Sequence, residues 1–232
     1  KSFFGKANKD IPEVGELDPE IVTHAIQKLL NISYEPRPAD YAKRIHEAAL
    51  ELVPARALGF CPGCPHRATY WAIKMALALD GRDGFVLGDI GCYGLGMGPS
   101  GFGQMKTIHA MGSGTGLACG FGQLDRFGLE QPVVAVCGDS TFYHAAMPAL
   151  VNAHYNGSNF LLLLLDNSAT AMTGFQPHPG TGLTAIGEAA PVIDLKAVCE
   201  SFGARVEVVD PFDVSATAET ILRLLQDEKG VK

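Results

Sequence analysis

Short apolar runs recur along the chain from about residue 54 onward. Five such runs lie at 84–88, 106–110, 133–137, 160–165 and 205–209, and those at 133–137 and 160–165 are apolar at every position. Such continuous runs are typical of parallel strands that are covered on both faces. Helical segments lie between the runs, at about 67–80, 113–125, 146–156, 192–202 and 213–227. The pattern therefore predicts a doubly wound α/β domain, whose mainly parallel sheet carries helices on both faces.

The first 54 residues follow a different pattern, that of two amphipathic helices. Asp18, Pro19 and Glu20 supply an N-cap, a proline at the first helical position and an acid in the first turn, so a helix is predicted from about 19 to 30. The stretch "SYEPRP" interrupts the chain, and a second helix is predicted over 39–53. Two short helices cannot bury a core alone, so we predict a helical arm or linker over 1–54 and an α/β domain over 55–232.

Composition indicates a folded protein. The chain has 232 residues, of which 47% are hydrophobic and 19% charged, enough to bury a sizeable core. Its net charge is −7 and its 18 Lys and Arg residues are scattered, which argues against a nucleic-acid or anionic membrane surface as partner. The longest apolar run, 160–165, is far shorter than a membrane span, so no membrane partner is expected.

Two further features bear on the setting of the chain. Six cysteines in this length are too few for a disulfide scaffold, and we therefore expect a cytoplasmic protein. The first residue is Lys rather than Met, and "KSFFGKANKDIPEVGELDPE" is typical of a mid-chain connector. We expect a piece of a longer polypeptide.

Glycine-rich or small polar sequence follows four consecutive predicted strands. The stretches are "IGCYGLGMGPSGFG", "MGSGTGLACG", "GDST" and "NSATAMTGFQPHPGTG". In open parallel sheets, ligands bind outside the carboxyl ends of the strands. Glycine lets backbone N–H groups approach an anion, and a helix N-terminus adds partial positive charge. The four loops together favour a phosphate-bearing ligand, although each one alone also fits a plain tight turn.

Asp139 and Asn167 stand at the ends of two neighbouring predicted strands. One helix and one strand separate them, so they are expected to project into one crevice. Mg²⁺ is usually held by one or two protein oxygens, with ligand phosphates and water completing the shell. A carboxylate, an amide oxygen and the backbone carbonyl of Ala169 would suit it. The alternative is that Asp139 caps a helix and Asn167 makes a turn.

These residues also carry a resemblance. Gly138-Asp139-Ser140 with the later Asp166-Asn167 resembles the signature of thiamine-diphosphate enzymes, in which such residues hold Mg²⁺ and the cofactor pyrophosphate. The stretches "CPGCPHR", "GDIGCY", "GDSTFYH" and "DNSATAMTGFQPHPGTG" sharpen it. Together they are similar to the thiamine-diphosphate region of the alpha subunit of indolepyruvate:ferredoxin oxidoreductases, in the 2-oxoacid:ferredoxin oxidoreductase superfamily. The resemblance covers about 55–209.

The resemblance implies a role for each matching residue. The implied metal ligands are Asp139, Asn167 and the carbonyl of Ala169. The implied cofactor-binding residues are Gly91, Cys92, Gly138, Asp139, Ser140, Thr141, Asn167, Thr173 and Gly174. His109 is the implied catalytic residue, a hydrogen-bond donor to phosphate or substrate, although a histidine at a strand end is as often structural. His66, His144 and His178 are more often structural, and they remain candidates to line the substrate channel.

Cys61, Cys64 and Cys92 match three of the four cysteines that hold a cluster beside thiamine in many superfamily members. A four-thiolate site needs a fourth ligand, and Cys199 lies in a predicted helix, earlier than the family's fourth ligand would fall. Cys-x-x-Cys spacing also suits Zn²⁺, with His66 near. A [4Fe-4S] cluster, a zinc ion and no metal therefore stay open. We favour the last, with the clusters elsewhere in the assembly.

The implied activity is oxidative decarboxylation of a 2-oxo acid, such as the arylpyruvate indolepyruvate, to an acyl-CoA. It depends on thiamine diphosphate and Mg²⁺, uses coenzyme A and passes electrons to ferredoxin through iron–sulfur clusters. No Glu in 54–232 stands at a strand end suited to the pyrimidine, so a pyrimidine-binding domain or subunit is expected to supply the activating Glu. A gamma/beta-type subunit is a further implied partner.

Two other functions stay open. A non-oxidative thiamine-dependent 2-oxo acid decarboxylase or synthase subunit would share the Asp139 and Asn167 site but would have no use for the three loop cysteines. A non-catalytic module would bind a metal or a nucleotide through the same loops.

Overall fold

The computed structural model describes residues 4–35, 37–38, 40–54, 57–227 and 229–232, in two units that divide between residues 56 and 57. The first unit holds α1 (Pro19–Leu30) and α2 (Tyr41–Leu52), both fully described and without a buried residue. The Asp18 carboxylate accepts the Ile21 N–H at 2.8 Å, which confirms the predicted start of α1. Ala39 and Ala55, where the second helix and the α/β domain were predicted to begin, lie outside the described residues.

Three parallel strands form the sheet of the second unit. They are β1 (Phe85–Leu87), β2 (Val133–Gly138) and β3 (Leu161–Leu165), side by side in this order. Val134 of β2 lies in register with Val86 on one side and Leu161 on the other. The central strand is buried from Val133 to Cys137, as its uninterrupted apolar sequence predicts. The α/β fold with parallel strands is confirmed.

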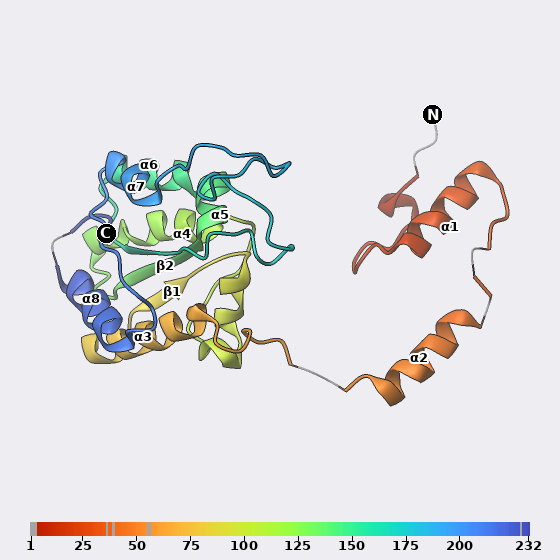
Figure 1. Cartoon of the computed structure of the whole chain (residues 1–232), viewed down its shortest axis with the longest axis horizontal. Coiled ribbons are helices and arrows are strands. Elements are labelled where there is room, and N and C mark those ends of the chain that lie inside the picture. Colours follow the sequence, from red (N-terminus) through yellow and green to blue (C-terminus); the bar gives the residue numbers. More distant parts are fainter. Residues whose placement is uncertain (1–3, 36, 39, 55–56, 228) are drawn as a thin grey trace. The chain divides into compact units, whose positions relative to one another are not determined.

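Helices cover both faces of this sheet (Figure 1). They are α3 (Pro65–Asp80), α4 (Ser113–Phe121), α6 (Met147–Asn156), α7 (Leu195–Ser201) and α8 (Val214–Gln226). On the face of α3 and α8, Val134 and Val136 pack in one core with Tyr70. On the face of α4, α6 and α7, Ala135 and Cys137 belong to a second core. Alternate side chains of β2 thus enter opposite cores, because strand side chains alternate in direction.

The predicted strand at 106–110 is wrong. Only its start touches the sheet, where the Lys106 N–H donates to the Val86 carbonyl at 2.8 Å. Beyond that point the Thr107 hydroxyl donates to the Gly88 carbonyl at 3.0 Å and accepts the Gly88 N–H at 3.1 Å. A side chain therefore takes the place of the backbone ladder at the end of β1, and the segment leaves the sheet.

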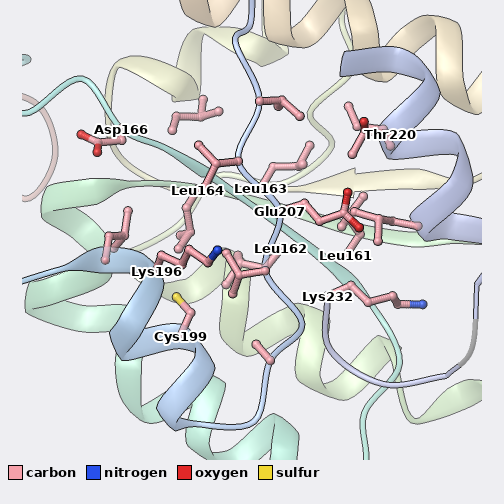
Figure 2. Close-up of a pocket in the computed structure, with 18 of the residues that line it drawn as sticks. Leu161, Leu162, Leu163, Leu164, Asp166, Lys196, Cys199, Glu207, Thr220 and Lys232 are labelled. Carbon is pink, nitrogen blue, oxygen red and sulfur yellow. The ribbon is translucent and has the colours of Figure 1, made fainter. Parts of the chain in front are cut away.

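The predicted strand at 205–209 is also wrong. On the edge of β3 that faces away from β2, the first residues of the strand pair instead with Lys232: the Leu162 N–H donates to the Lys232 carbonyl at 2.7 Å. Val231 in turn accepts the Arg205 N–H at 3.3 Å. A cavity of about 380 Å³ separates the rest of β3 from 205–209, and the β3 leucines and Glu207 line it (Figure 2). In this segment Val206 packs against the second core, whereas Val208 is exposed, and the backbone N–H of Arg205 is bonded to Val231 and not to β3.

Helix bounds differ from the predicted ones by three or more residues in three places. α4 ends at Phe121 rather than 125, and α7 begins at Leu195 rather than 192 because Asp194 caps it, accepting the Ala197 N–H at 2.7 Å. The helix predicted from 146 starts earlier, with α5 (Asp139–Thr141) and a π turn over Phe142–Ala146 that runs into α6. Pro148 follows this turn and lacks the N–H that a regular helix would use there. None of the described helices is long and apolar enough to cross a membrane.

A close contact between α4 and the end of β1 gives a test of this packing. A Cβ on Gly114 would stand 2.7 Å from the Cα and 2.8 Å from the carbonyl carbon of Gly88. Because backbone atoms cannot move aside as a flexible side chain does, Gly114→Ala should lower the free energy of unfolding by about 1–3 kcal/mol. Urea unfolding measures this. Gly116, in the same helix, has open space around it, so Gly116→Ala should raise stability by about 0.5–1 kcal/mol. Equal effects of the two changes would contradict the close approach.

Candidate functional site

The loops after β1, β2 and β3 enclose a cavity of about 90 Å³ at the carboxyl ends of the strands. This is the edge of a parallel sheet at which ligands bind. Its lining brings together most of the residues predicted for the site, namely His66, Gly91, Cys92, Gly138, Asp139, Ser140, Thr141, Asn167, Ala169 and Thr173. The larger cavity beside β3 includes Asp166 and His66 but neither Asp139 nor Asn167. We therefore take the smaller cavity as the candidate site.

Asp139 begins the helical segment directly after β2 and is only 2% exposed. Its Oδ1 accepts the Ser140 N–H at 2.7 Å, and its Oδ2 lies 3.0 Å from Nε2 of His178. Burial raises the pKa of Asp139; the Ser140 N–H opposes that shift and the neighbouring Asp166 carboxylate adds to it. A cation beside the two carboxylates would offset both the burial and their mutual repulsion.

Asn167 follows β3 and faces the same cavity from the other side. Its side chain is exposed, and its Oδ1 accepts the Ala169 N–H at 3.4 Å. The Thr170 hydroxyl lies 2.7 Å from the Ser140 hydroxyl, which ties this loop to the helix start at Asp139. Asn167 thus makes the turn contact of the alternative interpretation, whereas Asp139 caps no helix: it is the first helical residue after the N-cap Gly138, and no side chain caps this start. Both side chains border one cavity, as a metal site requires.

Glycines and an aromatic ring form the floor of the cavity. A Cβ on Gly91 would stand 2.2 Å from the ring of Tyr93, and a Cβ on Gly138 would stand 3.0 Å from the same ring. Ser140 and Thr141, both buried, place hydroxyl groups at the start of the helical segment. The start of a helical segment favours an anion. The cavity therefore combines acceptors for a cation with donors for an anion.

Asp89 lies below this floor and is completely buried. Its carboxylate accepts the Tyr93 hydroxyl and, at 2.8 Å, the N–H of Gly114 in α4. Burial raises the pKa of Asp89, while these two hydrogen bonds lower it. Asp89 is not among the predicted site residues, although it is a carboxylate directly after an apolar run, which was a signal for it. Asp89 joins the loop after β1 to the start of α4.

Three predicted residues lie elsewhere. His109 is exposed in the segment that leaves the sheet, and Gly174 sits in a turn with φ of 120°. His144 is exposed as well. None of the three is among the residues that line the site cavity. The catalytic role of His109 and the cofactor contact of Gly174 stay predictions.

The three loop cysteines lie near one another. Burial raises the pKa of Cys92, and the neighbouring Cys64 and Cys61 thiols raise it further. Cys61 is exposed, Cys64 and Cys92 are half-buried, and Cys199 is buried in α7. Within the described ranges, no three or more His, Cys, Asp or Glu side chains are grouped closely enough to hold a metal ion. A [4Fe-4S] cluster or a zinc ion on these three thiols stays a prediction.

Two further residues, which act on Asp139, were not assigned a binding role from the sequence. Asp166 stands beside Asn167 in the same motif, which was the signal for it, and its carboxylate acts on Asp139. His178 was considered only for the substrate channel. It is 5% exposed and contacts Asp139 across 39 positions of the chain. Only the path of the loop after β3 brings it there.

Comparison with known proteins bears on this site. Residues 89–231 match the family model described as thiamine pyrophosphate enzyme, C-terminal TPP binding domain. Indolepyruvate oxidoreductase subunit IorA of Methanothermobacter marburgensis is 40% identical over 230 residues, which are 97% of this chain and 35% of that protein. The subunit of the same name from Thermococcus kodakarensis is 41% identical over 231 residues, 94% of this chain and 34% of that protein. The chain thus spans about a third of the length of the curated relatives it matches.

A solved structure shares the fold. The 2-oxoglutarate:ferredoxin oxidoreductase from Magnetococcus marinus, with 2-oxoglutarate, coenzyme A and succinyl-CoA bound, superposes with a TM-score of 0.57 at 18% identity. The match covers 77% of this chain and 62% of that one.

Proposed function

Because the chain belongs to the thiamine pyrophosphate enzymes and carries their C-terminal TPP binding domain, we propose that it forms one half of the active site of a 2-oxoacid oxidoreductase. This half would bind the diphosphate and Mg²⁺. The observation that carries the proposal is the single cavity bordered by Asp139 and Asn167. Relatives named indolepyruvate oxidoreductase support the reaction class.

The residues of the cavity fit the cofactor's charged end. A carboxylate, an amide oxygen and a backbone carbonyl are oxygen ligands of the kind that Mg²⁺ prefers, and Asp139, Asn167 and Ala169 supply them. Ser140, Thr141 and Thr173 would donate to diphosphate oxygens. When bound, thiamine diphosphate supplies the nucleophilic carbon and the electron sink that decarboxylation of a 2-oxo acid needs.

The size of the cavity indicates how much of the cofactor this chain holds. Pockets for small molecules usually measure roughly 300–1,000 Å³, whereas this one measures about 90 Å³. It suits the diphosphate with its cation, and we propose that the rings lie against a pyrimidine-binding domain or subunit. Among the described residues that line the cavity there is no glutamate, so that partner half would supply the Glu that activates the pyrimidine.

The residues of this chain then act by binding and orientation. Asp139 and Asn167 would hold the cation from neighbouring loops, and the negative charge of Asp139 would balance it. The Tyr93 ring would keep the floor closed beneath Gly91 and Gly138. Mg²⁺ would act as an anchor and a charge screen for the diphosphate, not as a Lewis acid on the substrate.

The relatives' names support the substrate, and the resemblance described above implies the partners. We propose an arylpyruvate such as indolepyruvate as the 2-oxo acid, coenzyme A as the acyl acceptor and ferredoxin as the electron acceptor, in an assembly with a gamma/beta-type subunit and its [4Fe-4S] clusters. A non-oxidative decarboxylase would share the site cavity. Cys92 lines the cavity, and Cys64 and Cys61 act on its thiol; this favours the oxidative reaction, because a non-oxidative enzyme has no use for these thiols.

Electron transfer and metal removal test the proposal together. The full-length enzyme, supplied with indolepyruvate, coenzyme A and oxidised methyl viologen, should reduce two viologens for each CO₂ released. Removal of Mg²⁺ with EDTA, followed by gel filtration, should abolish the activity, because the diphosphate loses its anchor. Mg²⁺ and thiamine diphosphate added together should restore it, and thiamine diphosphate alone should not. Release of CO₂ without viologen reduction would instead support the non-oxidative enzyme.

A further inference from the structure

The buried contact between His178 and Asp139 carries an inference that rests on the function proposed above. We propose that His178 is a positioning residue: its ring fixes the direction of the Asp139 carboxylate and thereby raises the affinity of the site for Mg²⁺. His178 is not among the residues that border the site cavity, so it is not placed to touch substrate there.

The hydrogen bonds of His178 define which ring nitrogen carries the proton. The Gly180 N–H donates to Nδ1 of His178 at 3.1 Å. A ring nitrogen that accepts a hydrogen bond has no proton, so the neutral ring carries its proton on Nε2. Nε2 lies 3.0 Å from Oδ2 of Asp139 and therefore donates to it. The contact needs no charge on the ring.

The ring itself has little freedom to move. It stacks on Tyr143 with ring centroids 5.5 Å apart and an interplanar angle of 29°. The Tyr143 hydroxyl donates to the Ile193 carbonyl at 2.5 Å. The backbone is held as well, because the Thr181 hydroxyl accepts the His178 N–H at 3.3 Å and donates to the His178 carbonyl at 2.8 Å. His178 is therefore a rigid donor for Asp139.

Each oxygen of Asp139 then has one hydrogen-bond donor. The Ser140 N–H holds Oδ1 and His178 holds Oδ2, so the carboxylate plane cannot turn without losing a bond. An ionised carboxylate oxygen accepts about two bonds, which leaves one site on each oxygen for a cation. Outer partners that orient metal ligands in this way are usually worth about 10–100-fold in metal affinity. Both ring nitrogens of His178 are already engaged, so it is not itself a metal ligand.

Two amide variants separate positioning from mere space filling. The side-chain N–H of glutamine reaches about as far as Nε2, whereas that of asparagine reaches only about as far as Nδ1. In the full-length enzyme with saturating thiamine diphosphate, titration calorimetry should show that His178→Asn raises the Kd for Mg²⁺ about 10–100-fold. His178→Gln should stay within about threefold of the wild type, since it restores the donor. His46, exposed in α2, supplies the matched control His46→Asn, which should change nothing.

The outcomes distinguish this inference from the proposed function. A wild-type enzyme that binds no thiamine diphosphate with Mg²⁺ would overturn the proposed function. A wild type that binds, together with an Asn variant of equal Mg²⁺ affinity, would overturn the positioning role alone. Histidine-selective ¹⁵N NMR of the wild type gives a second readout that needs no folded variant: the proton of His178 should sit on Nε2. A proton on Nδ1 would overturn the inference.

Discussion

Alanine in place of Asp139 is expected to raise the Kd of the full-length enzyme for thiamine diphosphate in the presence of Mg²⁺ by about 100-fold or more. Loss of one member of a desolvated charge pair costs about 2–5 kcal/mol, and each 1.4 kcal/mol is about tenfold in affinity. Asp139 is 2% exposed, and its carboxylate is the negatively charged member of the predicted ligand set. Titration calorimetry with and without EDTA measures the effect.

Two comparisons make this result specific. Asp139→Asn keeps an oxygen that can accept the Ser140 N–H but removes the charge, so it should still lose most of the Mg²⁺-dependent affinity. Glu188→Ala removes an exposed carboxylate in the loop that precedes α7 and should leave binding unchanged. If Asp139→Ala bound the cofactor as tightly as the wild type, Asp139 would not be a metal ligand.

The second large effect concerns stability and arises from Asp89. Asp89→Ala leaves the Gly114 N–H without its partner in a completely buried place, and the Tyr93 hydroxyl keeps only the Ile90 carbonyl as acceptor, at 3.0 Å. An unsatisfied buried donor costs about 1–3 kcal/mol and the space left by the side chain adds to that cost, so the free energy of unfolding should fall by about 3 kcal/mol. Asp89→Asn keeps an acceptor oxygen for the Gly114 N–H, while the Tyr93 hydroxyl can donate to the Ile90 carbonyl, so it should lose less, about 1 kcal/mol.

Urea unfolding of the purified protein measures both variants of Asp89. The matched control is Asp83→Asn, because Asp83 is exposed and asparagine tolerates its φ of 56°; it should stay within about 0.5 kcal/mol of the wild type. An Asp89→Ala protein as stable as this control would show that Asp89 does not hold the loop after β1 against α4.

The same residue gives a pH dependence with a definite sign. Burial raises the pKa of Asp89 in the folded protein, so the unfolded chain loses this proton at lower pH than the folded chain does. As the pH rises through the interval between the two pKa values, the wild type should lose stability relative to Asp89→Asn, which does not titrate. Above the folded pKa the difference should be constant. An advantage of the wild type that grows with pH would show a lowered pKa instead.

The fold was predictable where one physical demand dominated. The runs that became β1, β2 and β3 are apolar at almost every position because helices cover both faces of the sheet. The runs at 106–110 and 205–209 carry charged residues among the apolar ones, and whether such a run pairs also depends on its neighbours in the fold. The Thr107 hydroxyl bonds the backbone of Gly88 in place of a strand, and the Lys232 carbonyl accepts the Leu162 N–H in place of 205–209. Neither contact has a local sequence signal.

Part of the candidate site was also predictable from the sequence. The rule that ligands bind at the carboxyl ends of parallel strands was enough to place Asp139 and Asn167 at one cavity. The contact of His178 with Asp139 was not predicted, because it depends on the course of the irregular loop after β3. The role of Asp89 was not predicted for another reason. Its partners are Tyr93, four positions away, and the backbone N–H of Gly114 in α4, and no sequence pattern indicates that pair of contacts.

Anomalous diffraction from Mn²⁺ tests the central claim most directly. Mn²⁺ accepts the same carboxylate and carbonyl oxygens as Mg²⁺, and crystals of the full-length enzyme grown with it and thiamine diphosphate would reveal its position. One peak about 2.1 Å from both the Asp139 carboxylate and Oδ1 of Asn167, with the diphosphate on its other side, is the predicted result. A bound cofactor whose Mn²⁺ lies away from Asp139, or whose diphosphate contacts Asp139 and Asn167 without any metal, would contradict it.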